Sequence, residues 1–211
     1  MTRVLIVDDH MIIRRGLVQI LAEETRITQT FEACDGPSAL RALRLSRVDV
    51  VLLDIALGER DGLDLLKAIR AEFPGVGVIM LSVYPESQFA VRAIRSGAAA
   101  YLNKGCSPDD LFAAIFKVKA GGMYLTAATA ELLAQNVRQK KPGAPHEVLS
   151  NREFQVLQLL AQGRSVSEIA QQLALSVNTV STYRGRIFEK LELHSSVDLF
   201  SYAARYQLVS L

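Results

Sequence analysis

Short apolar runs alternate with helix-like stretches over the first 120 residues, and this alternation constrains the fold more than any other feature. The apolar runs lie at residues 3–7, 28–33, 48–53, 76–81 and 99–102. The helix-like stretches lie near residues 10–23, 36–46, 62–73, 86–96 and 107–119. Repeated strand–helix alternation predicts an α/β unit, a doubly wound five-stranded parallel sheet with helices on both faces. The apolar runs are nearly uninterrupted, as expected for strands covered on both sides.

Polar residues stand just after four of these apolar runs. They are Asp8, Asp9, Asp54, Ser82 and Lys104. Because the carboxyl ends of parallel strands open onto one crevice, we expect these side chains to meet at one edge of the sheet. Three crowded carboxylates repel one another unless a cation lies among them. A hard divalent ion with oxygen ligands, Mg²⁺, fits that need.

This set of residues is suited to phosphoryl transfer. A carboxylate such as Asp54 can attack phosphorus and form an aspartyl phosphate. Asp8 and Asp9 would hold the metal, while the Lys104 ammonium and the Ser82 hydroxyl would contact phosphoryl oxygens. Taken singly, the residues have simpler interpretations: the aspartate pair could cap the next helix, and the others could be turn or surface residues.

Composition narrows the class of protein. Of 211 residues, 50% are hydrophobic and 22% are charged, which predicts a packed globular chain. The net charge of +2 does not by itself require a nucleic-acid partner. The two cysteines, Cys34 and Cys106, form no disulfide framework. We expect a cytoplasmic protein without a membrane segment, because no signal peptide or membrane-length apolar run is visible.

The second part of the chain differs in character. A helix is expected around residues 126–138, and residues 138–145, with two prolines and a glycine, form the best linker candidate. We therefore expect three segments: a domain over 1–122, a linker with a helix over 123–147, and a small all-α four-helix domain over 148–211.

The all-helical tail carries clear start and stop signals. Ser150 with Glu153, and Ser165 with Glu168, have the capping-box spacing. Ser176 can cap a third helix that runs to about residue 191, and a fourth covers roughly 195–206. A helix, a short turn and a second helix around residues 174–176 predict a helix-turn-helix.

The third helix of the tail has two distinct faces when wound at about 100° per residue. Val180, Ile187 and Leu191 share the side expected to face the core. The remaining arc is small, polar and mildly basic, as a major-groove helix requires. The candidate DNA contacts are Asn178, Thr179, Ser181, Thr182, Arg184, Gly185, Arg186 and Lys190, with Arg184 nearer the core side and Lys190 on the flank. A plain solvated face, or one that binds a protein, is the alternative interpretation.

The first 125 residues resemble the receiver domain of two-component response regulators. The matching pieces are Leu5-Ile6-Val7-Asp8-Asp9-His10, Leu53-Asp54, Gly62, Leu81-Ser82, Gly97-Ala98 and Tyr101-Leu102-Asn103-Lys104. The resemblance implies that Asp54 accepts a phosphoryl group from a sensor histidine kinase. It also implies that Asp8, Asp9, Asp54 and the Ala56 backbone carbonyl bind Mg²⁺. Ser82 would shift toward the phosphoryl group, and Tyr101 would then turn inward. One departure is Gly58, where the family usually has proline; it leaves that loop more flexible.

Residues 149–206 resemble the DNA-binding domain of LuxR/NarL/FixJ-type regulators. The resemblance rests on Leu149-Ser150-Asn151-Arg152-Glu153, Val156-Leu157, Ala161-Gln162-Gly163, Glu168-Ile169-Ala170 and the run from Ser176 to Tyr183. The family often has lysine at Ser181 and histidine at Tyr183. Without that lysine, the operator sequence cannot be predicted from the chain.

Together the two resemblances predict a phosphorylation-dependent, DNA-binding transcriptional regulator. The expected partners are a sensor histidine kinase, double-stranded DNA and a second copy of the phosphorylated chain, with RNA polymerase as a further candidate. A protein-interaction switch, with the tail binding a protein instead of DNA, is the alternative. An enzyme is not expected, because the sequence has no Ser/His/Asp constellation or Gly-rich phosphate loop.

Overall fold

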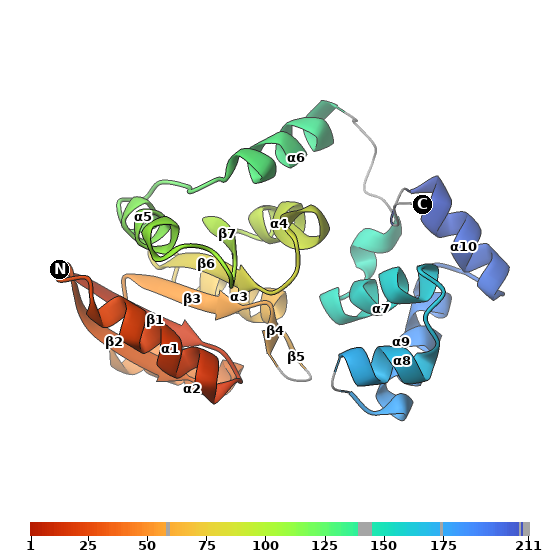
Figure 1. Ribbon diagram of the computed structural model, residues 1–211, viewed down its shortest axis with the longest axis horizontal. Helices are drawn as coiled ribbons and strands as arrows, with labels where there is room; N and C mark the ends of the chain where they lie inside the picture. The colour runs from red at the N-terminus through yellow and green to blue at the C-terminus, as the bar shows by residue number, and fades with distance from the viewer. Residues whose placement is uncertain (58–59, 139–144, 174, 207, 209–211) are drawn as a thin grey trace. The chain divides into compact units, whose positions relative to one another are not determined.

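The computed structural model describes residues 1–57, 60–138, 145–173, 175–206 and 208. Contacts within the chain divide it into two compact units, Met1–Lys140 and Lys141–Leu211. The first is an α/β unit and the second is all helical (Figure 1). The predicted fold class is confirmed.

The first unit is built on a parallel sheet of five strands. These are β1 (Thr2–Val7), β2 (Ile27–Ala33), β3 (Val50–Asp54), β6 (Gly77–Ser82) and β7 (Ala100–Asn103). Their order is β2-β1-β3-β6-β7, and every pairing is parallel. The chain steps from β1 outward to β2, then crosses to β3 on the other side of β1. Such a reversal of strand order opens a crevice at the carboxyl ends of β1 and β3.

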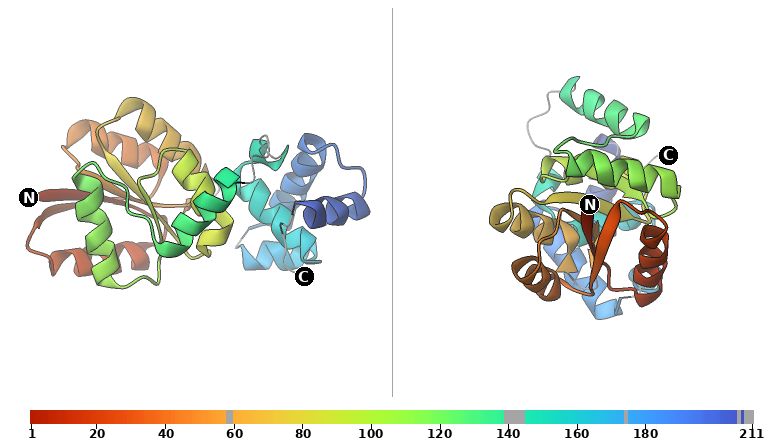
Figure 2. Two further views of the ribbon diagram at one scale, coloured as in Figure 1. Left: turned by 90° about the horizontal axis from the view of Figure 1, so that it is seen from above. Right: turned by 90° about the vertical axis from the view of Figure 1, so that its left-hand side faces the viewer.

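Helices cover both faces of this sheet (Figure 2). On one face, α1 (Met11–Ala22) and α5 (Pro108–Lys119) bury Leu21, Leu111 and Ile115 against strand residues such as Ile6 and Leu52. The intervening helices α2 (Gly36–Leu45), α3 (Gly62–Glu72) and α4 (Glu86–Arg95) contact the strands as well. The central strands are fully buried, which explains their uninterrupted apolar sequence.

Two very short antiparallel strands, β4 (Ala56–Leu57) and β5 (Arg60–Asp61), directly follow Asp54 and were not expected from the sequence. They bring the start of α3 back against the end of β3. A Cβ atom at Gly62 would lie 2.2 Å from the Asp54 carbonyl oxygen, so only glycine fits at this contact. Gly58, the residue that departs from the family pattern, lies outside the described residues.

The expected helix after the sheet is α6 (Ala127–Arg138), which packs against α4 within the first unit. The segment leading to it runs beside β7, where the Tyr124 backbone N–H donates to the Ala99 carbonyl at 3.0 Å. Residues 139–144, the centre of the expected linker, lie outside the described residues.

The second unit holds a 3₁₀ turn, η1 (Pro145–Val148), and the helices α7 (Asn151–Ala161), α8 (Val166–Gln172), α9 (Val177–Lys190) and α10 (Ser196–Arg205). Both capping boxes, at Ser150 and Ser165, are present, and the Ser176 side chain caps α9 as expected. The 3₁₀ turn was not expected. It is held by the His146 ring, whose Nδ1 lies 3.0 Å from the Tyr202 hydroxyl and which stacks on Phe154.

Candidate functional site

Three carboxylates meet at the crevice, supplied by two neighbouring strands. Asp8 and Asp9 follow β1, and Asp54 ends β3. One ligand atom from each of these residues, and one from His10, lie within 4.8 Å of one another. Asp8 and Asp54 are buried, with exposed fractions of 1% and 3%, whereas Asp9 is exposed at the rim. The crevice is therefore acidic and open on one side.

Lys104 adds a positive charge to the site from the end of β7. It follows β7, and its Nζ lies 2.6 Å from Asp8 Oδ2 and 2.8 Å from Asp54 Oδ2. Its backbone N–H donates to the Ser82 carbonyl at 2.7 Å, which ties the ends of β6 and β7 together. The structure thus brings Asp8, Asp54 and Lys104 together from three strand ends, whereas Ser82 joins them here through its backbone carbonyl alone.

Burial and ion pairing together shift the pKa values of Asp54 and Lys104. Burial raises the pKa of the Asp54 carboxyl, and the Lys104 ammonium opposes that shift only in part. For Lys104, burial alone would lower the pKa, but the carboxylates of Asp54 and Asp8 outweigh it and raise the pKa. Lys104 therefore stays protonated at neutral pH and is available to a phosphoryl oxygen.

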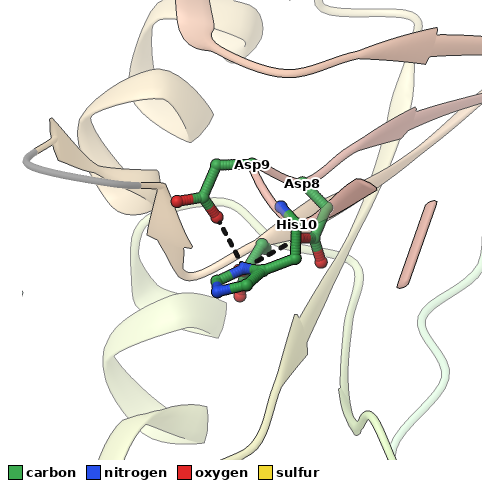
Figure 3. A group of neighbouring side chains, drawn as sticks. Asp8, Asp9 and His10 are labelled. Carbon is green, nitrogen blue, oxygen red and sulfur yellow. Dashed lines mark hydrogen bonds and ion pairs between the residues drawn. The ribbon is translucent and has the colours of Figure 1, made fainter. Parts of the chain in front are cut away.

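The acidic pair does not cap α1. The N-cap residue is His10, without a side-chain cap hydrogen bond. The Asp8 carboxylate instead accepts from the His10 backbone N–H at 2.8 Å and from Lys104. Figure 3 shows the His10 ring turned toward both carboxylates, with Nδ1 2.9 Å from Asp9 Oδ1 and 3.3 Å from Asp8 Oδ1. The alternative interpretation as a helix cap is wrong.

The donor set fits a hard divalent cation. Three carboxylates gather here, and Lys104 pairs with those of Asp8 and Asp54, so negative charge remains to be balanced. Carboxylate oxygens are the ligands that such ions prefer. The His10 side chain is 64% exposed, so it can leave the carboxylates without disturbing the core. The Ala56 backbone N–H donates to Asp54 Oδ1 at 3.2 Å, which puts the Ala56 peptide beside the same carboxylate.

Ser82 and Tyr101 lie behind the site on β6 and β7. Ser82 is fully buried, and its Oγ accepts from the Tyr84 backbone N–H at 3.0 Å. Tyr101 is also buried, and its hydroxyl donates to the Tyr84 carbonyl at 3.1 Å. Burial is the main cause of the raised pKa of Tyr101. Both residues thus hold the backbone of Tyr84, in the loop between β6 and α4, and the aromatic ring of Tyr101 lies in the inward position.

In the second unit, α9 presents the polar face expected from the sequence. Val180 and Ile187 are buried and Thr179 is half-buried. The remaining candidate DNA contacts are all exposed: Asn178, Ser181, Thr182, Arg184, Gly185, Arg186 and Lys190. The Thr182 hydroxyl donates to the Asn178 carbonyl at 2.9 Å.

Two basic residues of α9 also have contacts inside the unit. The Arg184 guanidinium lies 5.0 Å from the centre of the half-buried Phe188 ring, while Arg184 itself is exposed. Lys190 Nζ lies 2.6 Å from Oε2 of Glu153, a buried residue of the α7 capping box. This pairing was missed, because the two residues are 37 positions apart and no local signal joins them.

Comparison with known proteins places these units in families. Residues 4–116 match the response regulator receiver domain, and residues 147–203 match the bacterial regulatory proteins of the luxR family. The response regulator UvrY of Escherichia coli strain K12 is 36% identical over 209 residues, which cover 99% of this chain and 96% of UvrY.

Solved structures agree with the assignment. A structure of the RcsB response regulator of Salmonella typhimurium is 25% identical, with a TM-score of 0.58, over 97% of this chain and 98% of RcsB. The crystal structure of the response regulator ChrA of a heme-sensing two-component system is 33% identical, with a TM-score of 0.52, over 98% of each chain.

The chain belongs to the two-component response regulators that join a receiver domain to a luxR-type DNA-binding domain. It is a DNA-binding transcriptional regulator, as predicted. Among the described residues, no helix is long and apolar enough to cross a membrane.

Proposed function

We propose that Asp54 records a signal by accepting a phosphoryl group from the phosphohistidine of a sensor histidine kinase. The observation that carries this proposal is the buried Asp54 carboxylate beside Lys104, in a crevice that two further carboxylates line. A carboxylate oxygen of Asp54 would attack phosphorus while the bond from phosphorus to the kinase imidazole nitrogen breaks. The imidazole leaves and the phosphoryl group stays on Asp54.

The surrounding residues have distinct roles in this transfer. Asp8, Asp9, Asp54 and the Ala56 carbonyl would hold Mg²⁺, which when bound neutralises charge on the phosphoryl oxygens. Lys104 would give up part of its contact with Asp54 and pair with a phosphoryl oxygen. The Ser82 hydroxyl would donate a hydrogen bond to the same group, and Tyr101 would follow the loop that Ser82 holds.

Acetyl phosphate labelling tests the acceptor. The full-length protein with acetyl phosphate and MgCl₂ should gain one acid-labile phosphoryl group, measured by intact mass. Asp54→Asn should gain none. Asp64→Asn, at an exposed aspartate in the first turn of α3, should be labelled like the wild type. Labelling that survives in Asp54→Asn would exclude Asp54 as the acceptor.

We further propose that the phosphorylated chain forms a homodimer in the cytoplasm and binds paired promoter half-sites through α9. Support comes from the exposed polar face of that helix. The RcsB structure, by its description, concerns DNA interaction. Asn178, Ser181, Thr182 and Gly185 would approach base edges, and Arg184, Arg186 and Lys190 would lie near phosphates. RNA polymerase would be a further partner at the promoter.

Salt dependence separates DNA binding from the protein-binding alternative. Affinity for duplex DNA from a random pool, measured by anisotropy, should fall steeply as salt rises, because each phosphate contact releases counterions. A flat response would favour a protein partner for the tail.

We propose that residues 1–122 form the phosphoacceptor domain, residues 123–147 the linker and residues 148–211 the DNA-binding domain. We further propose that the chain acts as a regulator and not as an enzyme.

A further inference from the structure

The start of α4 is joined to the start of α6 by a carboxylate that accepts two hydroxyl hydrogen bonds. Glu86, the first residue of α4, accepts at Oε2 from the Thr129 hydroxyl at 2.6 Å and from the Thr126 hydroxyl. Thr129 is 1% exposed and Glu86 is half-buried. Hydrogen bonds to a charged acceptor are about twice as strong as neutral ones. These two bonds therefore hold the start of α6 firmly against the start of α4.

Thr126 also organises the helix that it attaches. Its Oγ1 accepts from the Thr129 backbone N–H at 3.0 Å, in the manner of an N-cap residue. Farther along the two helices, Arg95 Nη2 lies 3.3 Å from Asn136 Oδ1, and both of these residues are exposed. Glu86 therefore helps to fix the start of α6 on α4, against which α6 packs (Figures 1 and 2).

Glu86 stands only four residues after Ser82, at the end of the loop that Ser82 and Tyr101 hold. That loop is fixed at the backbone of Tyr84, where the N–H donates to Ser82 Oγ and the carbonyl accepts from the Tyr101 hydroxyl. If the Ser82 side chain rotates so that Oγ moves toward a phosphoryl group on Asp54, Oγ moves away from the Tyr84 N–H that donates to it. A displacement of Tyr84 then moves Glu86, because only Pro85 separates them.

We propose that Glu86, Thr126 and Thr129 form a clasp that docks α6 onto α4 in the resting domain, and that phosphorylation of Asp54 opens it. This inference rests on the proposed role of Asp54. Opening the clasp uncovers the α4 surface beneath α6 and frees α6, the helix within the proposed linker. Phosphorylation in the crevice would thus release α6 from α4.

Hydrogen exchange on the full-length protein tests the clasp. Without phosphorylation, Thr129→Val removes a hydroxyl from the clasp and should speed exchange in peptides covering residues 126–138 by about tenfold, the effect of losing one hydrogen bond to a charged group. Thr129→Ser keeps a hydroxyl and should restore protection. Asn136→Ala changes an exposed residue on the same helix, so it is the matched control and should have a much smaller effect.

A second arm tests the coupling to phosphorylation. Acetyl phosphate and MgCl₂ should remove protection of residues 126–138 in the wild type and leave Asp54→Asn unchanged. The phosphoryl group is measured by intact mass in the same samples. A wild type that gains no phosphoryl group would overturn both the proposed role of Asp54 and this opening.

Two outcomes would overturn the clasp alone. In the first, the phosphoryl group is present but residues 126–138 stay protected. In the second, Thr129→Val in the resting state exchanges like the wild type. If Thr129→Val lowers the Tm, Glu86→Gln provides a second variant, because the neutral amide weakens the same bonds without altering the core around Thr129.

Discussion

At the residue scale, the backbone of Asp54, the proposed phosphoacceptor, has a close neighbour in Gly62, which has no side chain. A Cβ at position 62 would lie 2.2 Å from the Asp54 carbonyl oxygen and 2.9 Å from Ile55 Cα, and these backbone atoms cannot rotate aside. Gly62→Ala should therefore destabilise the protein by roughly 3 kcal/mol, in the range of strongly overpacked sites. Urea denaturation measures the loss.

The control for this substitution is Gly16→Ala in the middle of α1. No atom lies within 4 Å of a Cβ built at Gly16. The same change there should leave stability unaltered or raise it by up to about 1 kcal/mol, because alanine favours the helix. Equal effects at both positions would contradict the steric account of Gly62.

The buried Asp54 carboxyl also makes stability depend on pH. Burial raises its pKa in the folded state, so over a range above the unfolded value of about 3.9 the folded protein holds a proton that the unfolded chain has lost. The contribution of Asp54 to stability is therefore fully present below that range and is lost as pH rises through the folded pKa.

Comparison with Asp54→Asn isolates this contribution. Urea denaturation in EDTA from pH 4 to pH 7 should show the stability of the wild type declining relative to that of the variant. A difference that grows in favour of the wild type as pH rises would mean that Lys104 outweighs burial. Adding MgCl₂ should stabilise the wild type more than the variant at pH 7, because the ion favours the ionised carboxylate.

At the scale of elements, α9 has a structural contact that competes with its expected role at DNA. Burial would raise the pKa of Glu153, but Lys190 and the Ser150 backbone N–H outweigh it and hold the pKa below its usual range. Lys190→Ala should thus destabilise the second unit by about 1 kcal/mol, a modest value because the lysine is itself partly exposed. Thermal denaturation measures this effect.

Arg186→Ala is the matched comparison, because Arg186 is exposed on the same helix. It should leave the Tm unchanged. It should also reduce the slope of the logarithm of DNA affinity against the logarithm of salt concentration by about one, because one phosphate contact is lost. The prediction from sequence that Lys190 contacts a DNA phosphate stands if Lys190→Ala reduces the salt dependence as Arg186→Ala does. It fails if Lys190→Ala changes stability alone.

Gly185 is a glycine inside α9. Its backbone is helical without a positive φ, and nothing lies within 4 Å of a Cβ built there, so the fold does not require glycine. Gly185→Ala should raise stability by about 1 kcal/mol. It should also weaken binding to pool-selected duplex DNA if the helix backbone approaches the bases at this position. Gly16→Ala, which gains helix propensity in the other unit, should leave DNA affinity unchanged.

At the scale of the whole molecule, the sequence predicted what short-range patterns and strand order determine. Asp8, Asp54 and Lys104 could be brought together because each stands at the end of an apolar run in a parallel sheet. Contacts between distant side chains could not be predicted. Glu86 and Thr129 are 43 positions apart, and neither lies in a pattern that indicates a partner. The hairpin after Asp54 and the 3₁₀ turn at His146 depend on tertiary packing in the same way.

The two units divide the function between them. The first holds the acidic crevice, and the second holds the polar face of α9. We propose that a phosphoryl group on Asp54 changes how strongly the second unit binds DNA. Such coupling between sites amounts to a difference in binding free energy, and typical values correspond to about 5- to 150-fold in affinity.

The most direct test measures the affinity of the full-length protein for a duplex selected from a random pool, by anisotropy, with and without acetyl phosphate and MgCl₂. The wild type should bind about tenfold more tightly when phosphorylated, and Asp54→Asn should bind equally in both conditions. Equal affinity for the phosphorylated and unphosphorylated wild type, or a response that persists in Asp54→Asn, would contradict the account.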